Sequence, residues 1–470
     1  MRLFNTLTRT LEDFQPLEPG VVRMYTCGPT VWNYQHLGNY RTYLLFDLLR
    51  RHLEVSGYRV EQVMNITDVD DRIIKRSAEE GVSIGEYTAP WERIFREGLA
   101  ALRAEPAEHY PHATEYIRGM IDMVEDLIEK GHAYRSDDGI YYRISSFPAY
   151  GSLAHLDRAG MRPTARVAND DYDKESAADF ALWKFAQPVD EQVGAAWDAP
   201  FGRGRPGWHL ECSTMSMHFL GQTLDIHGGG IDLLFPHHEN EIAQSEGVTG
   251  HPFSRFWVHG QFLTDQVGEK MAKRLGNVVS LEDLLQQFDP SAVRLFLTAT
   301  AHYRSRLDVT EEGLHGAGEQ VRRLRELRGR LVDLEPSAVA DAALAERAEA
   351  ARRGYREALD DDLNLAQGLG QVMALIREAN TALDAGAVGE GAREALLHVL
   401  ADVDRHLDVL TGEETELEAE IQEQVDRREE ARRNRDYATA DRIRQELADR
   451  GILLEDTAQG VRWRRQGVQL

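Results

Sequence analysis

The first hundred residues alternate between short apolar runs and a longer amphipathic stretch. The runs VVRMYTCG, which ends at Gly28, and YRVEQVMNI are rich in β-branched and aromatic residues and predict strands. Between them, YRTYLLFDLLRRHLEVSG has apolar residues at helical spacing and closes at Gly57, which predicts a helix. Strand, helix, strand is the order of a βαβ unit in a parallel sheet, where ligands bind at the carboxyl ends of the strands.

The pattern changes twice further along the chain. From about Glu108 to Pro206 it is irregular, with Pro and Gly breaks and an acidic loop, ANDDYDKESAAD, so we expect an insertion in the sheet domain, which resumes at QTLDIHGGG. After roughly Thr310 the chain is rich in Ala, Leu, Glu and Arg, which predicts a helical bundle followed by a small C-terminal module. The predicted fold class is therefore α/β with an α-helical second half.

Composition narrows the class of protein. The chain has 470 residues, 28% of them charged and 42% hydrophobic, ordinary values for a globular protein. We read no secretory signal and no apolar stretch of the ~20 residues that a spanning helix needs, so we expect no membrane association. Because no secretory signal is readable, we expect the protein in the cytoplasm. In a reducing cytosol, two widely separated cysteines favour metal binding or catalysis over a disulfide.

The net charge of −25 argues at face value against a nucleic-acid partner. Its distribution changes that conclusion, because residues 401–424 alone carry −8, whereas residues 425–470 carry +2 and residues 321–330 carry +4. The acidity is concentrated in one short piece. We therefore predict a bipolar surface with a basic track that ends in the C-terminal module.

The segment PHHENE, residues 236–241, is a candidate metal site. Pro236 suits the first turn of a helix, and on that helix His237 and Glu241 share one face, as do His238 and Glu241. An imidazole and a carboxylate, with thiolates such as Cys27 available elsewhere, suit zinc. The alternatives are a solvated helix start and a buried, inert Cys27. Spacing does not choose between the two histidines.

Three further segments suit a nucleotide. In HLGN, residues 36–39 stand at a predicted helix N-terminus, which favours an anion. The loop EKMAKRLGN holds two of the chain's six lysines, Lys270 and Lys273, which suit contact with a polyphosphate unless they are chance surface residues. In DIHGGGID the glycines allow close backbone approach to a ligand, and Asp232 can accept hydrogen bonds from ribose hydroxyls.

Together these residues resemble the class I aminoacyl-tRNA synthetases, and most closely the cysteinyl-tRNA synthetase family. The segments that carry the resemblance, in family order, are FNTLTR, MYTCGPTVWNYQHLGNYRT, NITDVDD, GRPGWHLECSTM, DIHGGGIDLLFPHHENEIAQSE, EKMAKRLGN and AHYRS, with DYATADRIRQELADRGILLEDTAQGVRWRR at the C-terminal end. Each motif is modest alone, but the ordered set is highly specific.

The resemblance implies a Rossmann-type catalytic domain and six segments. We expect 1–107 as its first half with the zinc and ATP loop, 108–206 as a connective insertion, 207–270 as its second half, 271–310 as the ATP loop and stem-contact segment, 311–415 as a helical bundle, and 416–470 as a C-terminal anticodon-binding module.

The resemblance also assigns site residues. The positions that match zinc ligands are Cys27, Cys212, His237 and Glu241, for one Zn²⁺ per chain, with His238 excluded. The expected catalytic residues are His36, Asn39, Lys270 and Lys273, with Gly38 and Asp232 as further ATP contacts. Thr67 and Trp208 fall in segments that line the family's cysteine pocket. Arg462, Trp463, Arg464 and Arg465 are candidates for tRNA contact.

The implied activity is ATP-dependent activation of L-cysteine to cysteinyl-adenylate and its transfer to tRNA(Cys), with Zn²⁺ selecting the substrate thiolate and Mg²⁺ accompanying ATP. We expect a monomer. The chain departs from the family signatures at Asn39, Ala272 and Arg274, which replace a histidine and two serines. Alternative functions are a paralogous ATP-dependent ligase that joins cysteine to an amino sugar, a zinc hydrolase, and a non-catalytic tRNA-binding relative.

Reversing charge at the C-terminal end tests the predicted basic track. We expect the double variant Arg464→Glu, Arg465→Glu to bind tRNA more weakly and with a shallower salt dependence, because fewer counter-ions are released when phosphate contacts are lost. Filter binding at several salt concentrations measures both quantities. Unchanged affinity and salt slope would contradict the C-terminal part of the track.

Overall fold

The computed structural model divides the chain into two compact units. The first unit comprises Met1–Val278, Leu297–Asp308 and Ala351–Val372, and the second comprises Val279–Phe296, Val309–Ala350 and Met373–Leu470. The residues described are 1–156, 179–264, 280–337, 342–410, 414–434, 436–450, 452–457 and 460–465. Within these ranges, no helix has the length and apolar character needed to cross a membrane.

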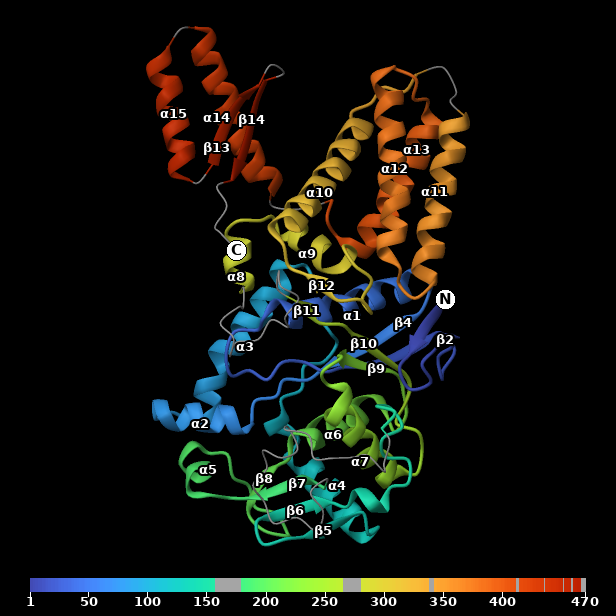
Figure 1. Ribbon diagram of the computed structural model, residues 1–470, viewed down its shortest axis with the longest axis vertical. Coiled ribbons are helices and arrows are strands. Elements are labelled where there is room, and N and C mark those ends of the chain that lie inside the picture. The colour runs from blue at the N-terminus through green and yellow to red at the C-terminus, as the bar shows by residue number, and fades with distance from the viewer. Residues whose placement is uncertain are drawn as a thin grey trace. The chain divides into compact units, whose positions relative to one another are not determined.

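A parallel four-stranded sheet forms the centre of the first unit (Figure 1). Its strand order is β10-β9-β3-β4, with β3 at Val21–Thr26, β4 at Arg59–Met64, β9 at Leu224–Gly230 and β10 at Ser254–Gly260, and every pairing is parallel. The predicted strands near residues 25, 60 and 225 are therefore present. This arrangement brings β3 beside β9, although almost two hundred residues separate them.

Helix α1 (Leu37–Val55) joins β3 to β4, as predicted, and is buried along most of its length. Arg41 on this helix is buried, and its guanidinium donates to four backbone carbonyls, those of Gln261, Phe262, His302 and Ser305. Burial lowers the pKa of Arg41 to about 10. These hydrogen bonds tie the chain that follows β10 to the helix that follows β3.

The insertion is more regular than its sequence pattern predicted. Helices α2 (Asp71–Glu80) and α3 (Ile84–Ala101) follow β4 and precede it. The elements of the insertion itself, within residues 108–206, are a 3₁₀ turn (Ala113–Tyr116), α4 (Ile117–Glu129), β5 (Ala133–Arg135), β6 (Gly139–Tyr142), a 3₁₀ turn (Ile144–Ser146), β7 (Phe180–Phe185), α5 (Pro188–Val193) and β8 (Gly204–Pro206). Strands β5-β6-β7-β8 form an antiparallel sheet. Of the acidic loop ANDDYDKESAAD, all but its last residue lies outside the described ranges.

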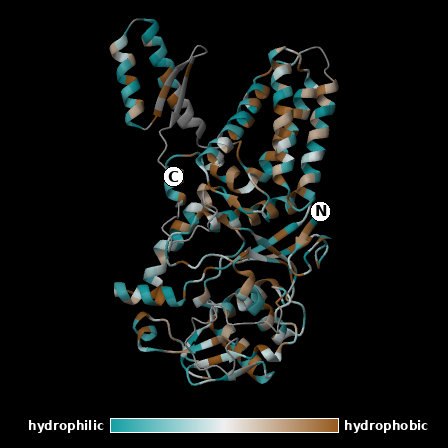
Figure 2. Ribbon diagram, in the orientation of Figure 1, coloured by the Kyte–Doolittle hydropathy of each residue, from teal (hydrophilic) through white to brown (hydrophobic). Residues whose placement is uncertain are grey.

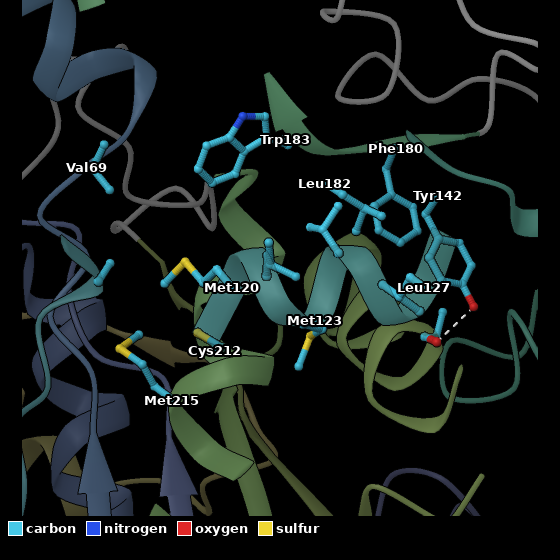
Figure 3. Close-up of a cluster of buried hydrophobic side chains, with 14 of the residues drawn as sticks. Val69, Met120, Met123, Leu127, Tyr142, Phe180, Leu182, Trp183, Cys212 and Met215 are labelled. Atoms are coloured by element: carbon cyan, nitrogen blue, oxygen red, sulfur yellow. Dashed lines mark hydrogen bonds between the residues drawn. The ribbon is translucent and has the colours of Figure 1, made fainter. Parts of the chain in front are cut away.

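The insertion shares its core with helix α6 (Trp208–Leu220), which returns the chain to the parallel sheet. Figure 3 shows Met120 and Met123 of α4 between Leu182 and Trp183 of β7 and the α6 residues Cys212 and Met215. Cys212 is thus anchored in apolar packing on one side. The remaining elements of the first unit are β1 (Arg2–Asn5), β2 (Thr10–Asp13), α7 (Glu239–Thr249), β11 (Leu263–Thr264) and β12 (Leu307–Asp308).

The second unit is mostly helical, as predicted. Helix α10 (Glu311–Val332) buries one apolar face, at Leu314, Ala317, Val321, Leu324, Leu327 and Leu331, and packs on α13 (Glu390–Leu407). Figure 2 shows the alternation of teal and brown along α10 that this periodicity produces. The unit also contains α8 (Leu281–Leu285), while α9 (Pro290–Ala299), α11 (Ala342–Asp360) and α12 (Leu365–Asp384) run through both units.

The C-terminal part of the second unit has its own small core. Helices α14 (Glu414–Arg433) and α15 (Tyr437–Asp449) pack together, and α15 packs on the hairpin of β13 (Ile452–Thr457) and β14 (Gly460–Arg465). The residues of this core are Ile421, Val425, Ile443, Leu447, Ile452 and Leu454. Residues 414–424, which belong to the acidic segment 401–424, lie in α14 and are therefore helical. The candidate tRNA residues 462–465 lie on β14, and their side chains are outside the described part.

Asp362 joins three segments of the first unit. Its carboxylate accepts hydrogen bonds from Phe4 N at 2.8 Å, from Tyr303 Oη at 2.6 Å and from Arg304 Nε at 2.7 Å. The residue is buried and has a φ of 61°, a left-handed conformation that asparagine also tolerates. The N-terminal hairpin is thereby fixed to the segment after residue 300.

Asp362→Ala should lower the free energy of unfolding of this unit by about 3 kcal/mol, because three donors lose their acceptor. Asp362→Asn keeps an acceptor and the backbone conformation, so its loss should be smaller. Asp361→Ala is the control, since Asp361 is half exposed and pairs with the exposed Arg2. Urea unfolding followed by circular dichroism measures the difference, and equal midpoints for Asp362→Ala and Asp361→Ala would contradict the assignment.

Candidate functional site

A cleft of about 660 Å³ opens at the carboxyl ends of the parallel strands. Cys27 follows β3, Gly230 ends β9, and Gly260 ends β10, and all three line the cleft. Other lining residues, among those predicted as site residues, are His36, Gly38, Asn39, Trp208, Asp232 and His237. The cleft therefore lies where an open α/β sheet normally binds its ligands.

At the base of this cleft, two cysteines, a histidine and a glutamate converge. Cys27, Cys212, His237 and Glu241 each offer a ligand atom, these atoms lie within 4.8 Å of one another, and all four residues are buried. Cys27 comes from the end of β3, where its N–H donates to Gly228 O at 3.0 Å, and Cys212 comes from α6. His237 comes from the turn that precedes α7, and Glu241 comes from the first turn of α7. We call these residues the first ligand set.

The helix that carries PHHENE begins later than expected. Helix α7 starts at Glu239, and residues Leu234–His238 form one wide π-type turn that contains a cis Phe235–Pro236 peptide bond. The sequence predicted Pro236 in the first turn of the α-helix. This prediction is wrong, because Pro236 precedes that helix. The i, i+4 relation still holds, because His237 Nε2 lies 3.0 Å from Glu241 Oε1.

A second, overlapping group of residues also satisfies the distances. Cys27, His227, His238 and Glu241 offer ligand atoms within the same 4.8 Å, and all are buried. We call this the second ligand set. His237 and His238 both point toward the cluster, so the choice that sequence spacing left open is not made by distance alone.

The residues of the first ligand set strongly perturb one another's pKa values. Burial alone raises the pKa of Glu241, but the charges of His227 and His237 lower it to about 2. Burial lowers the pKa of His237, but Glu241 and Cys212 raise it to about 10. Burial raises the pKa of Cys212, whereas its hydrogen bond with Cys27 and the charge of His237 lower it to about 6. Thiolate, carboxylate and imidazole thus compensate one another.

The donor set fits a divalent metal ion. Two sulfurs, one imidazole nitrogen and one carboxylate oxygen are typical ligands of a tetrahedral zinc site. Glu241 Oε1 is buried and, among the described residues, has no partner with hydrogen-bond geometry, although His237 Nε2 is 3.0 Å away. A cation between these two atoms satisfies both.

The HLGN segment caps helix α1. Asn39 N donates to His36 Nδ1 at 3.2 Å, and His36 N donates to Asn39 Oδ1 at 3.2 Å, which is a reciprocal capping box. Because Nδ1 of His36 accepts a hydrogen bond, a neutral ring carries its proton on Nε2. His36 therefore presents a donor at a helix N-terminus, where anions bind.

The glycines that precede Asp232 allow its approach to the strand. A Cβ at Gly230 would lie 2.5 Å from Asp232 Oδ1, so any larger residue there would displace the Asp232 carboxylate. Gly28 is required for a similar reason, because a Cβ at that position would overlap the carbonyl oxygen of Asn65. The loops after β3, β4 and β9 therefore pack closely around the cleft.

The two residues predicted for the cysteine pocket occupy different positions. Trp208 lines the cleft, is 38% exposed and stacks on His237, with ring centroids 4.2 Å apart. Thr67 is buried beneath it and donates to Glu211 Oε2 at 2.9 Å, while Asn65 Nδ2 donates to Thr67 Oγ1 at 3.1 Å. Thr67 is not among the residues that line the cleft, so its direct contact with substrate stays a prediction.

Several buried groups near the cluster were not predicted. Three histidines, His209, His227 and His259, contact the predicted ligands or His238. Burial lowers the pKa of His209 well below its usual value and that of His259 to about 3. The available signal was their position in WHLEC, DIHGGG and FWVHG, each beside a ligand or at a strand end. Lys270 and Lys273 lie outside the described residues.

Comparison with known proteins identifies the family. A model described as tRNA synthetases class I (C) catalytic domain matches residues 13–319, a DALR domain matches 354–410, and a model described as Cysteinyl-tRNA ligase anticodon binding domain matches 414–464. The cysteine–tRNA ligase of Solibacter usitatus is 45% identical over 99% of this chain and 100% of its own length. The chain belongs to the class I cysteine–tRNA ligase family.

Other relatives and solved structures agree with this family assignment. The cysteine–tRNA ligase of Symbiobacterium thermophilum is 45% identical over 99% of both chains. A Mycobacterium tuberculosis methionyl-tRNA synthetase in complex with methionyl-adenylate is 16% identical, with a TM-score of 0.60 over 83% of this chain and 90% of that one. The ternary complex of Agrobacterium radiobacter K84 agnB2 LeuRS is 12% identical. Its TM-score is 0.62, over 84% of this chain and 85% of that one. These two structures share the fold of this family member.

The capping box makes a prediction about Asn39. Asn39→Ala removes the acceptor for His36 N, at a cost of about 1 kcal/mol, so the dissociation constant for ATP should rise about fivefold. Asn39→Asp retains the acceptor and tests the cap through thermal unfolding only, because its negative charge would by itself weaken phosphate binding. Calorimetric titration with a non-hydrolysable ATP analogue measures the change. Equal affinities for wild type and Asn39→Ala would show that the capping box does not support the nucleotide site.

Proposed function

We propose that the protein activates L-cysteine with ATP to cysteinyl-adenylate and transfers the cysteinyl group to tRNA(Cys). The observation that carries this proposal is the buried first ligand set, two of whose residues, Cys27 and His237, line the same cleft as the HLGN segment and Asp232. A thiol-recognising metal site beside a nucleotide site suits a reaction between cysteine and ATP. Full-length membership in the cysteine–tRNA ligase family supports it.

Adenylate formation requires little acid–base catalysis by the protein. The substrate carboxylate is already a nucleophile, so the site must align it with the α-phosphate and neutralise charge on the departing pyrophosphate. His36 Nε2–H is placed at the α1 N-terminus to donate to a phosphate oxygen. Lys270 and Lys273, with Mg²⁺ bound to ATP, are proposed to neutralise the remaining charge.

The other side of the cleft suits the nucleoside. Asp232, which lines the cleft after the glycines of β9, is proposed to accept hydrogen bonds from the ribose hydroxyls. Its carboxylate lies close to Gly230, so the backbone there stays within reach of the same ligand. Gly38 allows the His36 ring to pack closely on the first turn of α1, because a Cβ there would lie 3.0 Å from His36 Nδ1.

Cys27, Cys212, His237 and Glu241 are proposed to hold one Zn²⁺. Bound there, zinc supplies a coordination position that a substrate thiolate fills and that a serine hydroxyl fills poorly. A site that rejects the wrong substrate through one missing strong bond reaches ~10⁴-fold discrimination without editing. Trp208, stacked on His237 at the cleft surface, is proposed to cover the side chain of the bound amino acid.

Transfer to RNA separates this proposal from the amino-sugar ligase alternative. A ligase for a small sugar has no need of an anticodon-binding module, whereas residues 414–464 match one. In the transfer step, a ribose hydroxyl of the terminal adenosine of the tRNA attacks the cysteinyl carbonyl of the adenylate. AMP is the leaving group. We propose Arg462, Trp463, Arg464 and Arg465 on β14 as part of the tRNA contact.

The remaining expectations belong to the same proposal. We propose the six segments bounded at residues 107, 206, 270, 310 and 415 as functional divisions of the chain. We propose that the protein acts as a monomer. A cytoplasmic location follows from a role in translation.

A pair of assays tests the function. ATP–pyrophosphate exchange should depend on cysteine and not on serine, and total tRNA should accept radiolabelled cysteine. ATP–pyrophosphate exchange without transfer of cysteine to tRNA would favour the amino-sugar ligase. Transfer of cysteine to an amino-sugar acceptor in place of tRNA would then identify that activity. Absence of both activities in zinc-loaded protein would overturn the proposal.

Cys212→Ala should abolish zinc retention and cysteine activation while leaving the fold largely intact, because it removes one of two sulfur ligands. Thr214→Ala, a buried position on the same helix outside both ligand sets, is the control. Metal content after dialysis and pyrophosphate exchange are the measurements. A metal-free variant that still exchanged at the wild-type rate would refute the role of the metal.

A further inference from the structure

A buried arginine on helix α1 binds the backbone of two segments that are far apart in the sequence. The guanidinium of Arg41 donates to the carbonyls of Gln261 and Phe262, at 3.1 Å each, and to those of His302 and Ser305, at 3.2 and 2.9 Å. The first two residues follow β10, and the other two belong to the motif AHYRS, which the proposed reaction does not use. One planar group therefore holds both segments to α1.

The surroundings of Arg41 require the shape of a guanidinium. The residue is 5% exposed, and none of the described carboxylates forms an ion pair with it. Burying a cation without a counter-charge is costly, and here only hydrogen bonds to carbonyls offset that cost. The rigid fork of a guanidinium reaches carbonyls in several directions at once, whereas the compact ammonium of lysine does not.

The segment after β10 that Arg41 binds forms one wall of the cleft. The four residues that line the cleft there, which we call the β10 wall, are Gly260, Gln261, Phe262 and Leu263. The wall lies directly against α1, since a Cβ at Gly260 would be 3.3 Å from Leu45 Cδ2. Arg41 is not among the lining residues, so any effect it has on a ligand in the cleft acts through this wall.

The AHYRS segment is bonded to the β10 wall as well as to Arg41. Gln261 N donates to Tyr303 O at 2.8 Å, and β11 pairs with β12 at Leu263 and Leu307. The hydroxyl of Tyr303 donates in turn to Asp362 Oδ1 at 2.6 Å. AHYRS thus connects the wall of the cleft with the buried carboxylate that fixes the N-terminal hairpin.

Helix α1 and the β10 wall lead to the residues proposed above for the two ends of ATP. His36, proposed for the phosphates, caps α1, and Arg41 lies in the second turn of the same helix. On the other side, Gly260 O accepts a hydrogen bond from Ile231 N at 2.9 Å, and Asp232, proposed for the ribose, is the next residue. The attachment of the wall to α1 therefore sets the separation between the phosphate contact and the ribose contact.

We infer that Arg41 is a positioning residue of the ATP site, which holds the HLGN segment and Asp232 at the spacing that one ATP molecule spans. The inference rests on the ATP site proposed above. A ligand that reaches both contacts gains affinity from their fixed spacing, whereas a ligand that reaches only one of them does not.

Three ligands distinguish a loss of spacing from other effects. A non-hydrolysable ATP analogue reaches both contacts, adenosine reaches only the ribose contact, and inorganic tripolyphosphate reaches only the phosphate contact. Displacement of a fluorescent ATP derivative measures the dissociation constant of each ligand without turnover. General damage to the fold would weaken all three, and loss of a nearby positive charge would weaken tripolyphosphate.

Arg41→Lys keeps the charge and removes the fork. The dissociation constant for the ATP analogue should rise about tenfold, because the two contacts no longer lie at the spacing of one ATP molecule. The constants for adenosine and tripolyphosphate should stay unchanged. Arg294→Lys is the matched control, because Arg294 is also buried and donates to the carbonyls of His406 and Leu407 within the second unit. It should bind all three ligands as the wild type does.

Tyr303→Phe is a milder variant that loosens the same support, because it removes the hydrogen bond to Asp362 and leaves Arg41 in place. The constant for the ATP analogue should rise about threefold, the effect of one lost hydrogen bond, again without change for the two shorter ligands. This variant keeps the test decisive if Arg41→Lys does not fold.

The outcomes separate this inference from the proposed function. A wild-type protein that does not bind the ATP analogue contradicts the ATP site itself. If the wild type binds it, the role of Arg41 alone is contradicted by full affinity in folded Arg41→Lys or by a parallel loss for all three ligands. Where Arg41→Lys does not fold, wild-type binding by Tyr303→Phe contradicts that role.

Discussion

Two thiols, an imidazole and a carboxylate buried within 4.8 Å of one another are the constraint on which this structure depends. Groups of this kind are costly to bury unless each is paired or bound to a shared cation. The protein meets the constraint with mutual charge compensation and with buried neighbours that orient each group. We propose that a metal ion satisfies all four groups at once and that the same ion makes the site selective for a sulfur-bearing substrate.

The fold brings these groups together from distant parts of the sequence. Cys27 ends a central strand of the parallel sheet, Cys212 lies on the helix that leaves the insertion, and Glu241 lies on the helix after β9. The insertion therefore contributes to the site through packing, because its α4 and β7 side chains press against the helix that carries Cys212 (Figure 3). The loops after β3 and β9, which we propose to bind the nucleotide, open onto the same cleft.

Much of the fold and of the candidate site could be predicted from the sequence. The features that could not be predicted were missed for physical reasons. Helix α1 and the strands beside it have strong periodicity and well-marked ends, so their positions were predictable. The antiparallel sheet of the insertion was missed because its strands have three to six residues and are separated by Pro and Gly. The motifs pointed to four residues that the structure brings together in one buried cluster, but the spacing of PHHENE leaves His237 and His238 open, and each belongs to a group whose ligand atoms lie within 4.8 Å.

The central claim is that the buried cluster binds the substrate sulfur through its metal. Visible absorption of the cobalt-substituted protein, titrated with cysteine and then with serine, tests it most directly, because a new sulfur–cobalt bond adds charge-transfer intensity. The account predicts that cysteine increases this intensity with saturation and that serine leaves the spectrum unchanged. An unchanged spectrum at cysteine concentrations that support adenylate formation would contradict it.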